Sequence, residues 1–217
     1  MSKARLIASI DVDAQKTFTP LCPKELPVPE GEKIGPALNA LAAYADLRVM
    51  TKDAHSAQAP WVVNCPEQML QPLGLENADV TWVAHAVPGT TGFELLDELP
   101  SPLDYDYRVY KGIEPDLHPY GACYHDLQEQ VSTGLIEWLH YQNVGIILLG
   151  GLALDYCVKT TALQLKRAGF EVVVVLEACR GIASDTSETA KTKMLAANIQ
   201  LCEQVGQLPA LLASINN

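Results

Sequence analysis

The sequence predicts one α/β domain over residues 1–217, with a doubly wound, mainly parallel six-stranded sheet and helices on both faces. Two observations predict this class. Short runs rich in β-branched residues alternate along the chain with longer stretches whose apolar residues recur at the period of a helix. Several short runs are apolar almost throughout, as expected for parallel strands covered on both faces. No internal repeat or linker divides the sequence.

The first half of the chain contains two predicted strands and one helix, followed by a long irregular insertion. Residues 6–12 form an almost wholly apolar run and are predicted as a buried strand. Residues 34–45 carry apolar side chains at i, i+3 and i+4, which indicates an amphipathic helix, and residues 47–51 form the second strand. Residues 54–102 are proline-rich, with a short strand or turn near 80–83. We expect this loop to be functional, because long loops in compact domains usually are.

The second half of the chain alternates strands and helices more regularly. Strands are predicted at residues 107–110, 144–149, 171–176 and 199–202. Helices are predicted at residues 127–141, 155–168 and 184–197. Gly169 follows the second of these helices at the position where helices often end, and Ser184 is expected to cap the beginning of the third.

The charge balance of the chain excludes several classes of partner. The 217 residues include 26 acidic and 15 basic side chains, for a formal net charge of −11, and 48% of the residues are hydrophobic. No cluster of Lys or Arg offsets this charge, so we expect binding neither to nucleic acid nor to a membrane surface. A small-molecule partner is favoured, and a homo-oligomer stays open.

Hydrophobic run lengths and cysteine usage favour a cytoplasmic location. The longest apolar stretch, residues 144–154, is far short of the roughly 20 residues that cross a bilayer. Residues 6–10 meet Asp11 before they reach the length of a signal-peptide core. The six cysteines are scattered without a Cys-x-x-Cys pair, unlike a disulfide scaffold or a zinc ribbon. We therefore expect reduced thiols.

Reactive side chains follow four of the predicted strands. Asp13 follows the first strand, Asp53 and His55 follow the second, Lys111 follows the third, and Cys157 opens the helix after the fourth. The carboxyl ends of parallel strands meet at one edge of a sheet, and ligands bind there at the point where strand order reverses. A carboxylate, an ammonium group, a thiol and a metal-binding pair are therefore expected at one site.

Cys157 is the candidate nucleophile of this site. A cysteine at a helix N-terminus lies at the positive end of the helix dipole, which favours the thiolate. The Lys111 ammonium favours it further, and Asp13 is placed to take the thiol proton and deliver it to a leaving group. These groups suit acyl transfer through a thioester. The alternatives are a small buried hydrophobic role for Cys157, a surface position for Lys111 and a loop-capping role for Asp13.

Five short segments contain most of the candidate residues. They are VDAQKTF at 12–18, KDAH at 52–55, WVAH at 82–85, KG at 111–112 and GLALDYCVK at 151–159. The most specific piece is the Asp-Tyr-Cys-Val-Lys run at 155–159, supported by Ala-Cys-Arg-Gly at 178–181. In this order the segments resemble the nicotinamidases of the isochorismatase-like cysteine hydrolase family, over nearly the whole chain.

The resemblance implies a catalytic triad of Asp13 as general base and acid, Lys111 as electrostatic partner and Cys157 as nucleophile. It implies an oxyanion hole formed by the amides of Ala153 and Cys157, with a cis peptide bond between Leu152 and Ala153. The implied reaction is hydrolysis of nicotinamide to nicotinate and ammonia through a cysteine thioester, which is a step of NAD salvage. Pyrazinamide is expected to be accepted as well.

A metal site is predicted beside this triad. Asp53 and His55 lie two residues apart at a strand end, a spacing that points both side chains the same way. The resemblance adds His85 as the third ligand of one divalent transition metal ion. Zinc is favoured, with iron or manganese as alternatives, and the ion would orient the pyridine ring. The resemblance also implies a histidine where this chain has Ala59, so the coordination number stays open.

Aromatic side chains are expected to form the walls of a pocket for a flat ring. The resemblance places these walls at Phe18, Trp82 and Tyr120. Leu154 and Cys123 stand where the resemblance implies threonine and phenylalanine, which leaves the shape of the acyl pocket and the substrate range open. Three further histidines are expected on loops or helix faces and are assigned no role: His118, His125 and His140.

Several alternative functions are weighed against this one. A metal-free hydrolase of the same fold would act on isochorismate or another small amide, although it would not need the predicted metal ligands. A non-catalytic small-molecule binding protein would also keep the fold. An aspartyl phosphotransferase is disfavoured because Gln15 stands where its motif requires Thr or Val. A thiol redox role is weakened by the lack of a resolving cysteine near Cys157 in the sequence.

Overall fold

The computed structural model describes residues 5–215 and contains the predicted six-stranded sheet. Its strands are β1 (Leu6–Val12), β2 (Leu47–Asp53), β5 (Tyr107–Lys111), β6 (Val144–Leu152), β7 (Glu171–Arg180) and β8 (Gln200–Cys202). They lie in the order β5-β2-β1-β6-β7-β8, and every neighbouring pair is parallel. The predicted fold class is confirmed.

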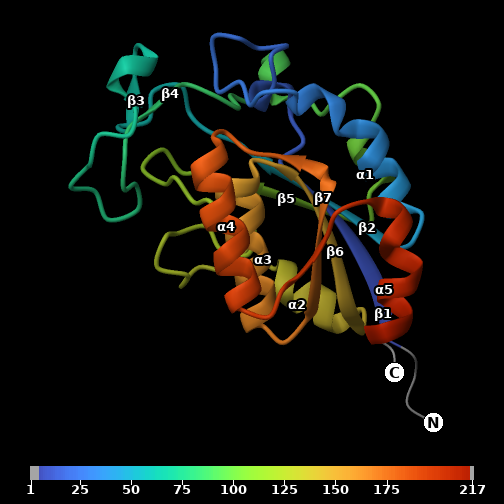
Figure 1. Cartoon of the computed structure of the whole chain (residues 1–217). Coiled ribbons are helices and arrows are strands. Elements are labelled where there is room, and N and C mark those ends of the chain that lie inside the picture. Colours follow the sequence, from blue (N-terminus) through green and yellow to red (C-terminus); the bar gives the residue numbers. More distant parts are fainter. Residues whose placement is uncertain (1–4, 216–217) are drawn as a thin grey trace.

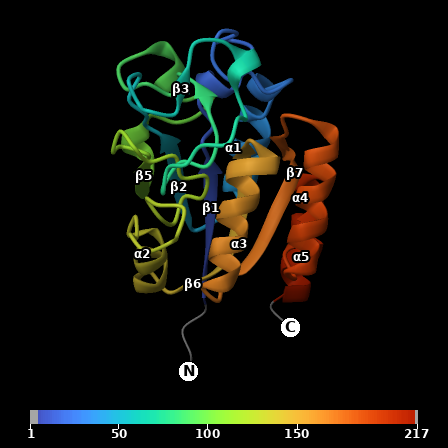
Figure 2. The ribbon, with the colours of Figure 1, turned by 90° about the vertical axis from the view of Figure 1, so that its left-hand side faces the viewer.

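Helices cover both faces of this sheet (Figure 1). On one face lie α1 (Gly35–Ala42) and α5 (Leu208–Ile215). On the other face lie α2 (Leu135–Tyr141), α3 (Lys159–Arg167) and α4 (Ser184–Ala196), and Figure 2 shows α3 in front of the sheet. Each face therefore has its own apolar core, one including side chains of α1 and α5 and the other including those of α2, α3 and α4.

The strand order creates a crevice at the carboxyl ends of β1 and β6. From β1 the sheet extends through β2 and β5, whereas from β6 it extends in the opposite direction through β7 and β8. Loops that leave β1 and β6 therefore diverge and leave room for a ligand. The segment between β2 and β5 lies over this edge of the sheet and includes a two-stranded sheet of β3 (Val62–Val63) and β4 (Trp82–Val83) (Figure 1).

Short 3-10 helices connect many of these elements. Within residues 5–215 they are Lys16–Phe18, Gly31–Lys33, Pro66–Gln68, Thr91–Phe93, Pro102–Asp104 and Val205–Gln207. No helix in this part of the chain combines the length and the apolar character needed to cross a membrane.

The helix predicted at 127–141 begins later than expected, at Leu135. The carboxylate of Asp126 accepts hydrogen bonds from the backbone amides of Gln130 and Val131 at 2.8–3.0 Å. These side-chain bonds replace helical backbone bonds and hold the segment as a loop. Helical periodicity was therefore a misleading signal there, because a local polar interaction stabilises the alternative.

Two further helix predictions differ from the structure. Ser184 is the first residue of α4 rather than its cap, and the carboxylate of Asp155 accepts hydrogen bonds from the amides of Ile182 and Ala183 just before this helix. Helix α5 was not predicted from the sequence; its apolar residues pack against the core on the α1 side. Both features depend on contacts between segments far apart in the sequence.

A substitution at Gly151 tests whether β6 must approach β1 closely at this residue. Gly151 has a φ of +140°, and a Cβ atom added there would lie 1.9 Å from the carbonyl oxygen of Val12. We expect Gly151→Ala to lower the free energy of unfolding by at least about 2 kcal/mol, because it adds both backbone strain and overlap. Urea denaturation measures this change. The matched variant Gly74→Ala has no atom within 4 Å of its new Cβ, and equal stability losses in both variants would contradict the prediction.

Candidate active site

Asp13, Lys111 and Cys157 meet at the crevice between β1 and β6. Asp13 directly follows β1 with a φ of 45°, Lys111 is the last residue of β5, and Cys157 lies in a π-helical turn, Leu154–Val158, that precedes α3. The Nζ atom of Lys111 lies 3.0 Å from Oδ2 of Asp13 and 3.8 Å from Sγ of Cys157. All three side chains are buried. The structure thus groups the three predicted residues around one ammonium group.

Lys111 lies between two buried carboxylates. Its Nζ atom contacts Asp53 as well as Asp13, and Thr51 donates a hydrogen bond of 2.6 Å from Oγ1 to Oδ1 of Asp13. Burial favours the neutral amine, but the attraction of Asp13 and Asp53 outweighs it and holds the pKa of Lys111 above its ordinary value. The lysine is therefore a buried cation paired with one carboxylate that directly follows β1 and another at the end of β2.

The two carboxylates beside Lys111 differ in their affinity for a proton. Burial raises the pKa of Asp13, and the attraction of Lys111 only partly opposes this effect. Burial also favours the protonated form of Asp53, but Lys111 and the neighbouring His55 and His85 together outweigh it, so the pKa of Asp53 lies below its ordinary value. Asp13 is therefore the group able to take up a proton, while Asp53 stays ionised.

The thiol of Cys157 does not behave as the sequence suggested. Burial raises its pKa well above the ordinary value, Lys111 partly opposes this, and the charges of Asp13 and Asp53 raise it further. The expectation that the helix end and the ammonium group lower the pKa of this thiol is therefore wrong, because they do not compensate for burial beside carboxylates. The resting sulfur is a thiol and needs a base, which Asp13 can supply.

The turn that carries Cys157 is fixed by its own backbone. The peptide bond between Leu152 and Ala153 is cis, which confirms the expectation from the resemblance. The carbonyl oxygen of Ala153 accepts hydrogen bonds from the amides of Tyr156 and Val158, each at 3.1 Å. These bonds close the π-helical turn and hold the thiol against the end of β6. The oxyanion role of the Ala153 and Cys157 amides stays a prediction.

A pocket with aromatic walls includes Cys157 among its lining residues. Phe18, Trp82 and Tyr120 all line this pocket, as does Tyr156, which the sequence analysis did not single out. The Trp82 ring centroid lies 6.4 Å from that of Tyr120 and 5.5 Å from that of Tyr156, with the rings nearly perpendicular in the second pair. Mostly apolar aromatic walls suit a small flat ring that carries few polar groups.

Four residues singled out in the sequence lie away from this pocket. Leu154 and Cys123 belong to the apolar core on the side of α2, α3 and α4, so they act on the pocket only through what they pack against. His125 lies on a loop, and His140 is exposed on α2, where its ring stacks on Phe170. Both histidines thus occupy the kinds of position that were expected.

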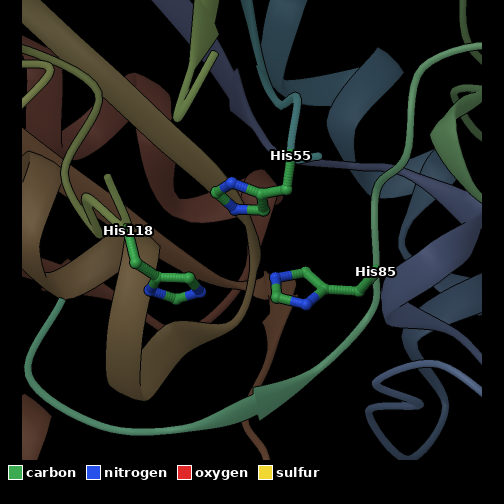
Figure 3. A group of neighbouring side chains, drawn as sticks. All are labelled: His55, His85 and His118. Atoms are coloured by element: carbon green, nitrogen blue, oxygen red, sulfur yellow. The ribbon is translucent and has the colours of Figure 1, made fainter. Parts of the chain in front are cut away.

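Three histidines converge beside the carboxylate of Asp53 (Figure 3). His55 lies two residues beyond β2 and His85 two residues beyond β4, and one ring nitrogen from each lies within 4.8 Å of one from His118. The Oδ1 atom of Asp53 lies 3.4 Å from Nε2 of His55. The sequence analysis missed His118, although its place two residues before Tyr120 was a signal that it lies near the pocket.

The histidine cluster has the properties of a metal site. The Nδ1 atoms of His55 and His85 face the carbonyl oxygens of Gly112 and Val83, at 3.2 and 2.7 Å, which leaves Nε2 of each ring available. The buried Nε2 atom of His55 and both ring nitrogens of His118 lack a hydrogen-bond partner within residues 5–215. Burial also lowers the pKa of His85 to about 3, so its imidazole is neutral. Imidazole nitrogens without a hydrogen-bond partner, beside a carboxylate, fit a divalent transition metal ion.

Comparisons with known proteins agree with this geometry. A model of the isochorismatase domain matches residues 8–205. A nicotinamidase of Acinetobacter baylyi is 31% identical over 92% of this chain and 94% of its own length. Among solved structures, a nicotinamidase and pyrazinamidase of Acinetobacter baumanii has a TM-score of 0.83 at 27% identity, covering 95% of this chain and 100% of its own. A pyrazinamidase of Pyrococcus horikoshii in complex with zinc has a TM-score of 0.69 at 30% identity, covering 90% of this chain and 97% of its own.

The doubly wound sheet with its buried Asp-Lys-Cys cluster at the switch point, together with these relatives, defines a hydrolase. More particularly, the chain belongs to the isochorismatase domain family, and its similar relatives are nicotinamidases.

Removal of the buried ammonium group should destabilise the fold. In Lys111→Met the carboxylates of Asp13 and Asp53 lose the cation between them, and leaving one partner of a buried ion pair alone costs about 3–5 kcal/mol. We therefore expect a loss of this size in the free energy of unfolding, measured by urea denaturation. Lys24→Met, at an exposed position, serves as the control. A Lys111→Met protein as stable as this control would contradict the role of the ammonium group.

Proposed function

We propose that the protein hydrolyses nicotinamide to nicotinate and ammonia through a thioester on Cys157, and that it accepts pyrazinamide as well. The observation that carries the proposal is the contact of one buried ammonium group with Asp13 and Cys157 at the edge of an aromatic pocket. The relatives named nicotinamidase and pyrazinamidase support the choice of substrate. A flat ring with one carboxamide suits the mostly apolar, aromatic lining of the pocket.

Asp13 begins the reaction by taking the proton of the Cys157 thiol. The sulfur then attacks the carboxamide carbon, and the amides of Ala153 and Cys157 hold the negative oxygen of the tetrahedral intermediate. Asp13 returns the proton to the nitrogen, the carbon–nitrogen bond breaks, and ammonia leaves. Lys111 stabilises the ionised forms of both partners, because it lies against Asp13 and Cys157 throughout.

Water completes the cycle by hydrolysing the thioester. Asp13 takes a proton from the water as it attacks the thioester carbonyl, and the same amides of Ala153 and Cys157 hold the developing negative oxygen. The carbon–sulfur bond then breaks, nicotinate forms, and the sulfur regains a proton from Asp13. The raised pKa of Asp13 suits a group that accepts and donates a proton in each half-reaction.

The substrate ring is placed by the pocket walls and the metal site. Phe18, Trp82 and Tyr120 would contact the ring faces and edges. Asp53, His55 and His85 would hold one divalent ion, with zinc favoured over iron or manganese, as the zinc complex of the Pyrococcus horikoshii pyrazinamidase supports. When bound, the ion would act as a Lewis acid for the ring nitrogen and would so orient the carboxamide toward the thiol.

The product and the cysteines suggest a cellular setting. Formation of nicotinate from nicotinamide is a step of NAD salvage, and we place it in the cytoplasm as one domain that acts alone or as a homo-oligomer. All six cysteines are free in the structure, in keeping with a reducing compartment. A metal-free hydrolase of the same fold is disfavoured by the buried histidine cluster, which such an enzyme would not need.

Removal of the sulfur tests whether the site is catalytic. We expect Cys157→Ala to lower kcat/KM for ammonia release from nicotinamide by at least about a thousandfold, because no other group can form the thioester. Cys65→Ala, on the loop that follows β3, should keep the wild-type value. Unchanged turnover in Cys157→Ala would reject the thioester, and no turnover in metal-replete wild type would favour a binding protein.

Metal removal should alter the preference among ring amides. After dialysis against a chelator, we expect kcat/KM for nicotinamide to fall at least about tenfold, because the ring nitrogen loses its anchor. Benzamide has the same carboxamide without the ring nitrogen, so its slower hydrolysis should change little. Steady-state assays of both amides before and after zinc is restored measure this. Equal losses for both amides would show that the ion does not recognise the ring.

A further inference from the structure

His118 is a buried histidine for which the catalytic scheme provides no partner. It lies on the loop between β5 and α2 and is only 4% exposed. Both of its ring nitrogens lack a hydrogen-bond partner within residues 5–215. Burial of polar atoms without a hydrogen-bond partner is unfavourable, so a partner outside the chain is expected.

The backbone around His118 is fixed in place. Its amide donates a hydrogen bond of 2.8 Å to the carbonyl oxygen of Asn77, and the indole of Trp61 donates one of 3.1 Å to the carbonyl oxygen of Leu117. The carbonyl oxygen of Pro119, on the other side, lies 3.4 Å from Nζ of Lys111. The loop thus presents the imidazole from a rigid support, as a binding group requires.

The ring of His118 points into the histidine cluster. Figure 3 shows the imidazoles of His55, His85 and His118 directed toward a common space, and the three rings each contribute a nitrogen within 4.8 Å of the others. An aromatic residue also packs against the ring of His118: it stacks on the ring of Trp82, with an angle of 9° between the ring planes and centroids 5.7 Å apart. The carboxylate of Asp53, which contacts Lys111, also lies beside the cluster, with Oδ1 3.4 Å from Nε2 of His55.

We propose that His118 is a further metal ligand, so that three imidazoles, from His55, His85 and His118, surround the divalent ion together with the carboxylate of Asp53. Imidazole nitrogens and a carboxylate oxygen are ligands that zinc accepts, and zinc can take a fifth ligand such as a ring nitrogen or water. Because His118 also stacks on Trp82, it joins the ion to the wall of the substrate pocket.

The ligand role is tested by metal affinity and by the spectrum of bound cobalt. His118→Phe keeps a ring for stacking between Trp82 and His55 but removes both nitrogens, and His140→Phe makes the same change on the exposed face of α2. Zinc dissociation constants of the full-length apo proteins are measured by competition with a chromophoric chelator. Co²⁺ is then added alone, and its visible absorption reports the ligand set.

We expect the wild type and His140→Phe to bind one zinc ion with equal affinity. His118→Phe should bind it at least about tenfold more weakly and should shift the cobalt absorption bands, because one imidazole is lost. A folded His118→Phe protein with the wild-type zinc affinity and cobalt spectrum would overturn the proposal and make His118 a wall of the pocket only. A wild type that binds no zinc would overturn it as well.

A measurement on the wild type covers the case in which His118→Phe does not fold. Imidazole ¹⁵N resonances are followed as zinc is added, and the proposal expects those of His118 to shift together with those of His55 and His85. Unchanged His118 resonances would overturn it. The inference rests on the metal of the proposed function but not on the amide substrate. Ammonia release from nicotinamide by the same samples therefore separates failure of the ligand assignment from failure of the enzymatic proposal.

Discussion

The pairing of the buried Lys111 ammonium group with two carboxylates is the interaction on which the rest of the site depends. The ammonium group contacts the carboxylates of Asp13 and Asp53 and lies 3.8 Å from the sulfur of Cys157. A charge removed from water costs several kcal/mol unless it is paired, so these contacts stabilise the fold and also support the proposed catalysis. Because β1, β2 and β5 each supply one of the charged groups, the register of the sheet sets the geometry of the chemistry.

Two aspartates on neighbouring strands acquire different roles from their surroundings. Asp13 accepts a hydrogen bond from Thr51 and shares Lys111, yet burial still raises its pKa, which suits a group that moves protons. Asp53 contacts Lys111 and stays ionised beside the histidines, which suits a group that remains charged near a cation. Two carboxylates whose environments separate their proton affinities are a common arrangement in enzymes that transfer protons at neutral pH.

The sequence was sufficient to predict the residues that depend on local patterns. Apolar runs located the strands, and the rule for parallel sheets brought Asp13, Lys111 and Cys157 to one edge, where the structure has them. The predicted lowering of the pKa of the Cys157 thiol was wrong, because the burial that raises this pKa depends on the packing of distant segments and not on the residues beside Cys157. His118 was missed for the same reason, since contacts with the distant Asn77 and Trp61 aim its ring at the cluster.

The proposed mechanism requires that Cys157 rests as a thiol, which Asp13 activates for attack on the amide carbon. Rapid quenching of the enzyme with nicotinamide, followed by mass spectrometry of the peptide that contains Cys157, tests this requirement most directly. We expect a nicotinoyl group on that sulfur in the wild type and none in Asp13→Asn. Turnover without any modified Cys157, or equal modification in Asp13→Asn, would contradict it.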